Sequence, residues 1–303
     1  MPETATRGDT PVENSGDYRD YFYTSADGLR LYARDYPGPE DSTLLPVLCM
    51  HGLTRNSRDF AWIASHLART RRVISVDQRG RGRSAYDPDP ANYTPQVYVG
   101  DMFTLIDELA IERMLVIGTS MGGLMAMIMA NMQPQRFAGI VINDIGPELD
   151  PVGLDRIKGY VGRRREIRNW DDAVAATREI NETAFPKYTD AEWLRFTRGL
   201  YHEEDGVPVL SHDAAIAQPM LEEESNAVPL DLWPLFEGMQ HIPMLLVRGE
   251  LTDLLAMDCV EKMQAIAPDM IVAQIPDRGH APMLDEPVAV AAIEKFFARI
   301  DGG

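Results

Sequence analysis

The sequence has little cysteine: only Cys49 and Cys259 occur among 303 residues. They lie far apart in the chain, so the close spacing of a cysteine metal site is missing. We expect two reduced thiols with a structural role, as is usual inside the cell. A metal centre built on cysteine is thereby excluded.

Long apolar runs are also lacking. The longest, such as residues 47–50 and 271–275, are strand-sized and fall far short of the roughly 20 residues of a transmembrane helix. Residues 1–17 contain no apolar stretch, which excludes a secretory signal of the usual form. We therefore expect a flexible N-terminal tail at residues 1–17 of a cytoplasmic protein.

Basic residues are scarce beside acidic ones, with 29 Lys and Arg against 47 Asp and Glu and a formal net charge of −18. A negative surface repels phosphate polymers and anionic membranes, so we expect neither nucleic acid nor a membrane as partner. A G-x-G-x-x-G turn after a strand, a P-loop and a histidine pair at metal-ligand spacing are absent too. We predict no cofactor and no metal, and leave the oligomeric state open.

What the chain does have is 45% apolar residues, enough for a large core. From residue 18 onward, strand-like and helix-like segments alternate, which is typical of an α/β sheet with helices on both faces. Residues 18–24 and 29–36 flank the turn sequence Ala26-Asp27-Gly28 and predict an antiparallel hairpin. Between 146 and 227 charge rises and only amphipathic helices are predicted. We expect a core of residues 18–145 and 228–303 and a helical cap of residues 146–227.

One turn carries a chemical signature. Gly118-Thr119-Ser120-Met121-Gly122 follows a short apolar strand and precedes an apolar helix. In this context a strained turn lifts the serine hydroxyl above the sheet, and the glycines leave room for close packing. The turn also places Ser120 at a helix N-terminus, which favours developing negative charge. We predict Ser120 as a nucleophile rather than part of an ordinary tight turn.

A serine nucleophile needs a base, and in this architecture the histidine comes last, after the serine and an acid. Of the four histidines after Ser120, His202 and His212 fall in the predicted cap, and His241 lies just before a strand. His280 follows the last predicted strand, at the carboxyl edge where open α/β sheets place their sites. We predict His280 as the base rather than a histidine of a surface loop.

Two aspartates follow strands from which they can reach an imidazole. Asp253 comes after the strand that precedes the histidine strand, and Asp144 comes after the strand that follows the nucleophile. Asp144 also suits a structural role, hydrogen-bonding the backbone where the chain leaves the sheet. We favour Asp253 as the acid that orients His280 and keep Asp144 as the alternative acid.

Acyl transfer also needs two N–H donors for the developing oxyanion. One is the N–H of Met121, directly after the nucleophile. The other should come from the loop after the third strand, His51-Gly52-Leu53-Thr54-Arg55-Asn56, where glycine permits a bent backbone and Leu53 is the predicted donor. His51 is interpreted as a brace for this loop rather than a second base.

Five stretches carry a family resemblance: His51-Gly52-Leu53, Asp77-Gln78-Arg79-Gly80-Arg81-Gly82-Arg83-Ser84, Gly118-Thr119-Ser120-Met121-Gly122-Gly123, Gly249-Glu250-Leu251-Thr252-Asp253 and Gly279-His280-Ala281-Pro282. With them the chain resembles the α/β-hydrolase-fold serine hydrolases, in the group of esterases, lactonases and C–C hydrolases, from about residue 18 to residue 300. The resemblance implies a mostly parallel eight-stranded sheet flanked by helices with an inserted helical cap. It also supports Asp253 as the acid and implies that residues 77–84 form a structural loop held by its arginines.

Serine at the turn favours acyl transfer, because dehalogenases and epoxide hydrolases of similar outline carry an aspartate there. Meta-cleavage C–C hydrolases also have Ser-Met-Gly-Gly, but this chain has Leu53-Thr54-Arg55 in place of their glycine-rich loop and Ala281-Pro282 in place of a tryptophan after the histidine. An ester or lactone asks only for nucleophile, base, acid and oxyanion donors. We predict a hydrolase of small-molecule carboxylic esters or lactones that forms an acyl-enzyme. The alternatives are a C–C hydrolase and a non-catalytic small-molecule binder on this scaffold.

The cap is expected to shape the substrate pocket. Large side chains in or beside it are candidates for the pocket wall, although aromatic residues at helical spacing also build the core of a cap. Arg163-Arg164-Arg165 is interpreted as a solvated helix face rather than a site for an anionic substrate. The candidate wall residues are Trp193, Phe196, Tyr201, Met220 and Trp233.

Overall fold

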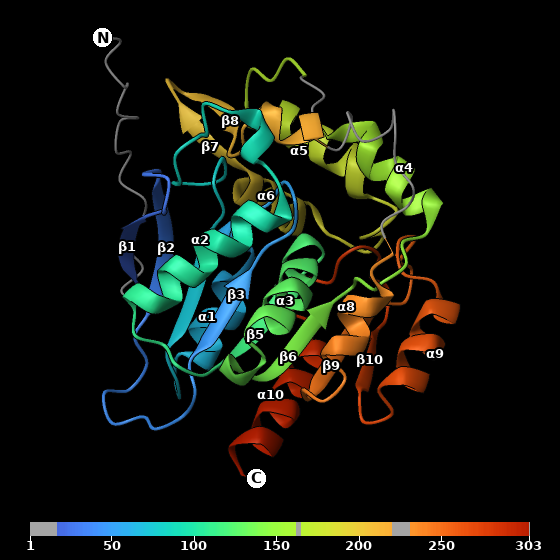
Figure 1. Cartoon of the computed structure of the whole chain (residues 1–303). Helices are drawn as coiled ribbons and strands as arrows, with labels where there is room; N and C mark the ends of the chain where they lie inside the picture. The colour runs from blue at the N-terminus through green and yellow to red at the C-terminus, as the bar shows by residue number, and fades with distance from the viewer. Residues whose placement is uncertain (1–16, 162–164, 220–230, 303) are drawn as a thin grey trace.

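A computed structural model describes residues 17–161, 165–219 and 231–302 (Figure 1). Eight strands form one sheet in the order β1-β2-β4-β3-β5-β6-β9-β10. The first two strands form an antiparallel hairpin, β2 is antiparallel to β4, and the other neighbours are parallel. The predicted fold and hairpin are thus confirmed. The strands are β1 (Arg19–Thr24), β2 (Arg30–Tyr36), β3 (Val47–Met50), β4 (Val73–Asp77), β5 (Met114–Thr119), β6 (Phe137–Asn143), β9 (Met244–Gly249) and β10 (Ile271–Ile275).

The central strands are apolar throughout because helices cover both faces of the sheet. Successive side chains of a strand point to opposite faces, so Leu48 and Met50 of β3 join one apolar cluster while Val47 and Cys49 join the other. The first cluster includes residues of α2 (Pro95–Glu108), α3 (Met121–Met132), α8 (Trp233–Gly238) and α9 (Met257–Ile266). The second includes residues of α1 (Ala61–Leu67) and α10 (Pro287–Asp301).

Between β6 and α8, the described residues leave the sheet and cover its upper end in Figure 1. We call residues 151–219, without 162–164, the insert. It contains α4 (Pro151–Tyr160), α5 (Trp170–Asn181), α6 (Asp190–Leu200), the strands β7 (Tyr201–Glu204) and β8 (Val207–Leu210), and the 3-10 turn η4 (Ala214–Ala217).

The expectation that this segment holds helices alone is wrong. Strands β7 and β8 pair antiparallel across a turn at Asp205 and Gly206, which have φ of 49° and 80°. A positive φ at both central residues is what a tight hairpin turn requires, and Asp-Gly supplies it readily. The signal was therefore visible in the sequence.

Smaller features complete the fold. Further 3-10 turns are η1 (Ser57–Phe60), η2 (Pro90–Asn92) and η3 (Pro134–Arg136). Both cysteines are buried, and neither forms a disulfide. Within the described ranges, the helices are all too short or too polar to cross a bilayer. Met220, Arg163 and Arg164 lie outside the described residues.

Candidate active site

Ser120 lies at the sharp turn between β5 and α3, with φ 52° and ψ −116°. A positive φ is unfavourable for a residue that has a Cβ, so the packing around this turn has to maintain the conformation of Ser120. The neighbouring glycine is required for that packing: a Cβ on Gly122 would lie 2.0 Å from the carbonyl oxygen of Met50. The carbonyl of Ser120 accepts hydrogen bonds from the N–H groups of Gly123 and Leu124, which begin the helix.

His280 lies in the loop after β10 and contacts the serine directly. Its Nε2 is 2.9 Å from Oγ of Ser120, and its side chain is largely buried. The loop is held from the insert, because the N–H of Gly279 donates to the carbonyl of Ala184 at 2.7 Å. The structure therefore brings the predicted nucleophile and the predicted base together.

The second nitrogen of the imidazole, Nδ1, lies 2.9 Å from Oδ2 of Asp144. Asp144 has a fully buried side chain that also accepts hydrogen bonds from the N–H of Gly249 at 2.8 Å and from the Thr252 hydroxyl at 2.6 Å. It follows β6 with a φ of 59°, and its own N–H donates to the carbonyl of Val247. Asp144, which the sequence suggested as the alternative acid, is thus the carboxylate that contacts His280.

Asp253, the acid that we favoured, is turned toward the insert instead. Its carboxylate pairs with the guanidinium of Arg156 on α4, where Nη2 donates to Oδ1 at 2.8 Å and Nε donates to Oδ2. Burial raises the pKa of Asp253, but the hydrogen bonds and charge of Arg156 outweigh it and hold that pKa below its usual value. The prediction that Asp253 orients the imidazole of His280 is therefore wrong, because this carboxylate is paired with Arg156.

The two predicted oxyanion donors lie beside the nucleophile. The loop after β3 passes so close that a Cβ on Gly52 would be 3.6 Å from Cβ of Ser120. Among the described residues, the backbone N–H groups of Leu53 and Met121 have no acceptor. Both are available to a negative charge that forms on a substrate at Ser120.

Two buried residues hold the Leu53 loop. Nε2 of His51 accepts the N–H of Gln78 at 3.0 Å, and Nε of Arg81 donates to the carbonyl of Leu53 at 2.9 Å. Burial lowers the pKa of His51 to about 3, so the ring is neutral at ordinary pH. These contacts agree with the interpretation of His51 as a brace and of the arginine-rich loop as structural.

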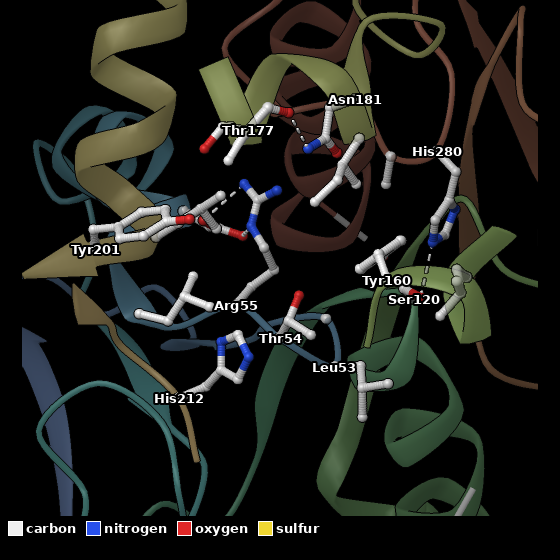
Figure 2. Close-up of a pocket in the computed structure, with 18 of the residues that line it drawn as sticks. Leu53, Thr54, Arg55, Ser120, Tyr160, Thr177, Asn181, Tyr201, His212 and His280 are labelled. Atoms are coloured by element: carbon white, nitrogen blue, oxygen red, sulfur yellow. Dashed lines mark hydrogen bonds and ion pairs between the residues drawn. The ribbon is translucent and has the colours of Figure 1, made fainter. Parts of the chain in front are cut away.

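A cavity of about 840 Å³ opens over Ser120 and His280 and runs below the insert (Figure 2). Tyr201 lines it as predicted, whereas Trp193 and Phe196 pack with one another inside the insert. Trp233 is partly buried against the core, with Nζ of Lys262 over its ring at 3.8 Å, and Met220 lies outside the described residues. Cavity residues that the sequence did not single out are Arg55, Tyr160, Thr177 and Asn181.

Comparison with known proteins gives consistent matches. The model of the alpha/beta hydrolase family matches residues 47–293 of this chain. The 3-hydroxybutyrate-oligomer hydrolase of Cupriavidus necator is 33% identical over 258 residues, which cover 83% of this chain and 87% of the relative. The 2-(acetamidomethylene)succinate hydrolase of Mesorhizobium japonicum is 28% identical over 234 residues, covering 77% and 81%. An alpha/beta hydrolase crystal structure from Novosphingobium aromaticivorans matches with a TM-score of 0.88 at 40% identity, covering 93% of this chain and 99% of that chain.

Proposed function

This chain belongs to the alpha/beta hydrolase family, and we propose that it cleaves carboxylic esters, lactones included, through an acyl-enzyme on Ser120. The observation that carries the proposal is the line of hydrogen bonds from Asp144 through His280 to Ser120, at 2.9 Å each. A nucleophile, a base and a residue that orients the base are the parts that acyl transfer requires. The free N–H groups of Leu53 and Met121 supply the fourth part.

In the first half of the reaction, Nε2 of His280 takes the proton of the Ser120 hydroxyl while Oγ bonds to the ester carbon. The carbonyl oxygen becomes an oxyanion and accepts hydrogen bonds from the N–H groups of Leu53 and Met121. When the tetrahedral intermediate collapses, the ester C–O bond breaks and the imidazolium gives its proton to the leaving oxygen. The product at this point is an acyl-enzyme and a free alcohol.

In the second half, His280 takes a proton from water, and the water oxygen attacks the acyl carbon. Collapse of the second oxyanion returns the proton to Oγ of Ser120 and releases the acid. Asp144 is a positioning residue in both halves. By accepting the Nδ1–H of His280 it fixes the tautomer that leaves Nε2 basic, and its negative charge stabilises the imidazolium.

The choice of an ester rests on what the site contains. The described residues around Ser120 supply the four parts of ester hydrolysis listed above, and a lactone is an ester within a ring. The Cupriavidus necator relative acts, by its name, on oligomers of 3-hydroxybutyrate, and oligomers of a hydroxy acid are joined by ester bonds. That similarity supports a hydroxy-acid ester as one substrate to include in the test.

The test is a rate assay on p-nitrophenyl esters of graded acyl length, a lactone panel, an oligomer of 3-hydroxybutyrate and one vinylogous dienoate. Wild type is compared with Ser120→Ala and with Ser65→Ala, a matched variant whose serine lies away from the cavity and contacts Asp17. We expect ester or lactone turnover in wild type and Ser65→Ala and its loss in Ser120→Ala. Cleavage of the dienoate alone would assign C–C hydrolysis instead, and no turnover of any compound would favour a non-catalytic binder.

A further inference from the structure

Arg55 extends into the cavity from the loop after β3, the loop that also carries Leu53. The loop passes beside the nucleophile: a Cβ on Gly52 would lie 3.6 Å from Cβ of Ser120 and 3.7 Å from Cγ of Arg55. Figure 2 shows the guanidinium between two parts of the cavity, with Ser120 and His280 on one side and Tyr201 on the other. A substrate that reaches from Ser120 toward Tyr201 therefore passes this cation.

The guanidinium is fixed in place by its neighbours. Its Nη2 donates to Oδ1 of Asp59 at 2.9 Å, and its Nε lies 2.7 Å from the other carboxylate oxygen. Its Cζ lies 4.3 Å from the centre of the Phe196 ring, and Nη2 also contacts the sulfur of Met283 at 3.2 Å. A guanidinium held on one edge and stacked on one face keeps a constant orientation.

The remaining edge of the guanidinium is available. Its Nη1 has no hydrogen-bond or ion-pair partner within the described part of the chain, and the side chain is 18% exposed. Two other arginines line the cavity, and each pairs with a carboxylate through two nitrogens, as Arg55 does with Asp59: Arg156 with Asp253, and Arg165 with Glu179. Arg165 also lies far more open to water, at 42% exposure. Arg55 belongs to the loop that passes beside Ser120, whereas Arg156 and Arg165 belong to the insert, so Arg55 is the arginine that we take as the contact for a ligand near Ser120.

We propose that Nη1 of Arg55 binds a carboxylate of the substrate, so that this enzyme prefers esters that carry a carboxylate beyond the scissile bond. This inference rests on the proposed ester hydrolysis. A guanidinium N–H and a carboxylate form a charge-assisted hydrogen bond, which is stronger than a neutral one and stronger again away from bulk water. The negative field of a chain with net charge −18 opposes an anionic substrate, so a fixed cation inside the cavity has a distinct role.

Asp59 sets the strength of this interaction. Its carboxylate shares the guanidinium and offsets part of the positive charge, which limits the attraction for a second carboxylate. Burial raises the pKa of Asp59 above its usual value, and the charge and hydrogen bond of Arg55 offset this only in part. Removing the charge of Asp59 should therefore strengthen the binding of an anionic substrate.

The experiment measures kcat/KM for pairs of esters that differ only in a terminal carboxylate or carboxamide. One pair is the mono-p-nitrophenyl ester of adipic acid and its carboxamide, with the test group on the acyl side. The other is the dimer of 3-hydroxybutyrate and its terminal carboxamide, with the group on the alcohol side. A hydrogen bond to a charged group contributes about 1.5–3 kcal/mol, so we expect wild type to prefer the carboxylate in at least one pair by roughly ten- to a hundredfold.

Two variants test the residue itself. In Arg55→Met the preference should fall to about one, because the stem remains and the cation is gone, while the carboxamide is still hydrolysed. In Asp59→Asn the preference should rise, because the competing negative charge is removed. Arg178→Gln is the matched control: it removes an arginine that pairs with Asp190 at the surface of the insert, and it should leave the preference as in wild type.

The outcomes separate the two proposals. Equal rates for both members of each pair in wild type, or an unchanged preference in Arg55→Met, would overturn the role of Arg55. Ser120-dependent hydrolysis of the carboxamide esters in the same assay would still uphold the proposed function. If Arg55→Met does not fold, Asp59→Asn decides. The role of Arg55 is then overturned if the preference of Asp59→Asn for the carboxylate ester equals or falls below that of wild type. If none of the esters is hydrolysed, the proposed function fails, and the role of Arg55 fails with it.

Discussion

Asp144 and Asp253 follow the neighbouring parallel strands β6 and β9, and they hold different partners. Asp144 lies 2.9 Å from Nδ1 of His280, whereas Asp253 is paired with Arg156 of α4. The first carboxylate belongs to the reaction in our proposal, and the second ties the insert to the sheet. The division of roles can be tested directly.

Replacing each aspartate by asparagine should separate the two roles. Asp144→Asn should lower kcat on a p-nitrophenyl ester by about 10³–10⁴-fold, because the amide cannot hold the imidazole in its basic tautomer. Asp253→Asn should change kcat by less than about tenfold, since its carboxylate does not touch the imidazole. The measurement is kcat of the two variants by steady-state kinetics. A larger loss of kcat in Asp253→Asn than in Asp144→Asn would make Asp253 the acid.

The Asp253 and Arg156 pair should contribute to stability rather than to chemistry. Both side chains are partly exposed, at 29% and 23%, so we expect a coupling free energy of about 0.5–1 kcal/mol. The measurement is a double-mutant cycle of Asp253→Asn and Arg156→Gln by urea unfolding. KM should rise in both single variants because Arg156 lines the cavity. Strictly additive unfolding free energies would rule out the coupling.

The close packing under the nucleophile predicts that Gly122→Ala is destabilising. The added Cβ would lie 2.0 Å from the Met50 carbonyl oxygen, and the backbone must shift, at a cost of about 1–3 kcal/mol or more. Gly100→Ala is the control: Gly100 is an exposed position of α2, a Cβ there would meet nothing within 4 Å, and the change should stabilise by up to about 1 kcal/mol. Equal unfolding free energies for both variants would contradict this account of the turn.

Buried neutral histidines should make stability depend on pH. Burial lowers the pKa of His51 to about 3 and that of His212 to about 4, below the ordinary value of 6.5. Between these values the unfolded chain binds more protons than the folded one, so each histidine makes the protein less stable as pH falls from about 6.5 toward about 4. His51→Asn should lose less free energy of unfolding between pH 7 and about pH 4.5 than wild type does.

Exposed His241 provides the control for that comparison. His241→Asn should show the same loss of stability as wild type, because this side chain is exposed to water in the folded chain as it is in the unfolded one. Carboxyl groups also change the pH dependence, since burial raises the pKa of Asp101 although Arg79 opposes it, so the difference between variants is the quantity to use. An identical loss in His51→Asn and wild type would contradict a neutral buried His51.

The positions of Ser120 and His280 could be predicted because local sequence determines them. The glycines around Ser120 are required by contacts within a few residues and with the adjacent strand, and His280 follows the last strand at the edge where such sites form. The acid could not be chosen in the same way. Its choice depends on the positive φ of Asp144 and on donors from Gly249 and Thr252, which lie at the end of β9 and in the loop after it.

The cavity wall was harder still to predict from the sequence. Helical spacing marked Trp193 and Phe196 as apolar, but it does not say whether an apolar face meets the substrate or the rest of the insert. Arg55 sits in a loop with no periodicity, and its place in the cavity follows from its contacts with Asp59 and with Phe196 of the insert. Contacts between segments distant in sequence decide such positions.

The most direct measurement of the central claim is mass spectrometry of the enzyme after reaction with a fluorophosphonate or a slowly hydrolysed ester. The account predicts one covalent adduct, on the peptide that contains Ser120, together with loss of ester turnover in step with labelling. It also predicts no adduct in Ser120→Ala and greatly slowed labelling in Asp144→Asn, because the serine is activated through His280. An adduct on another residue, or full ester turnover by Ser120→Ala, would contradict the account.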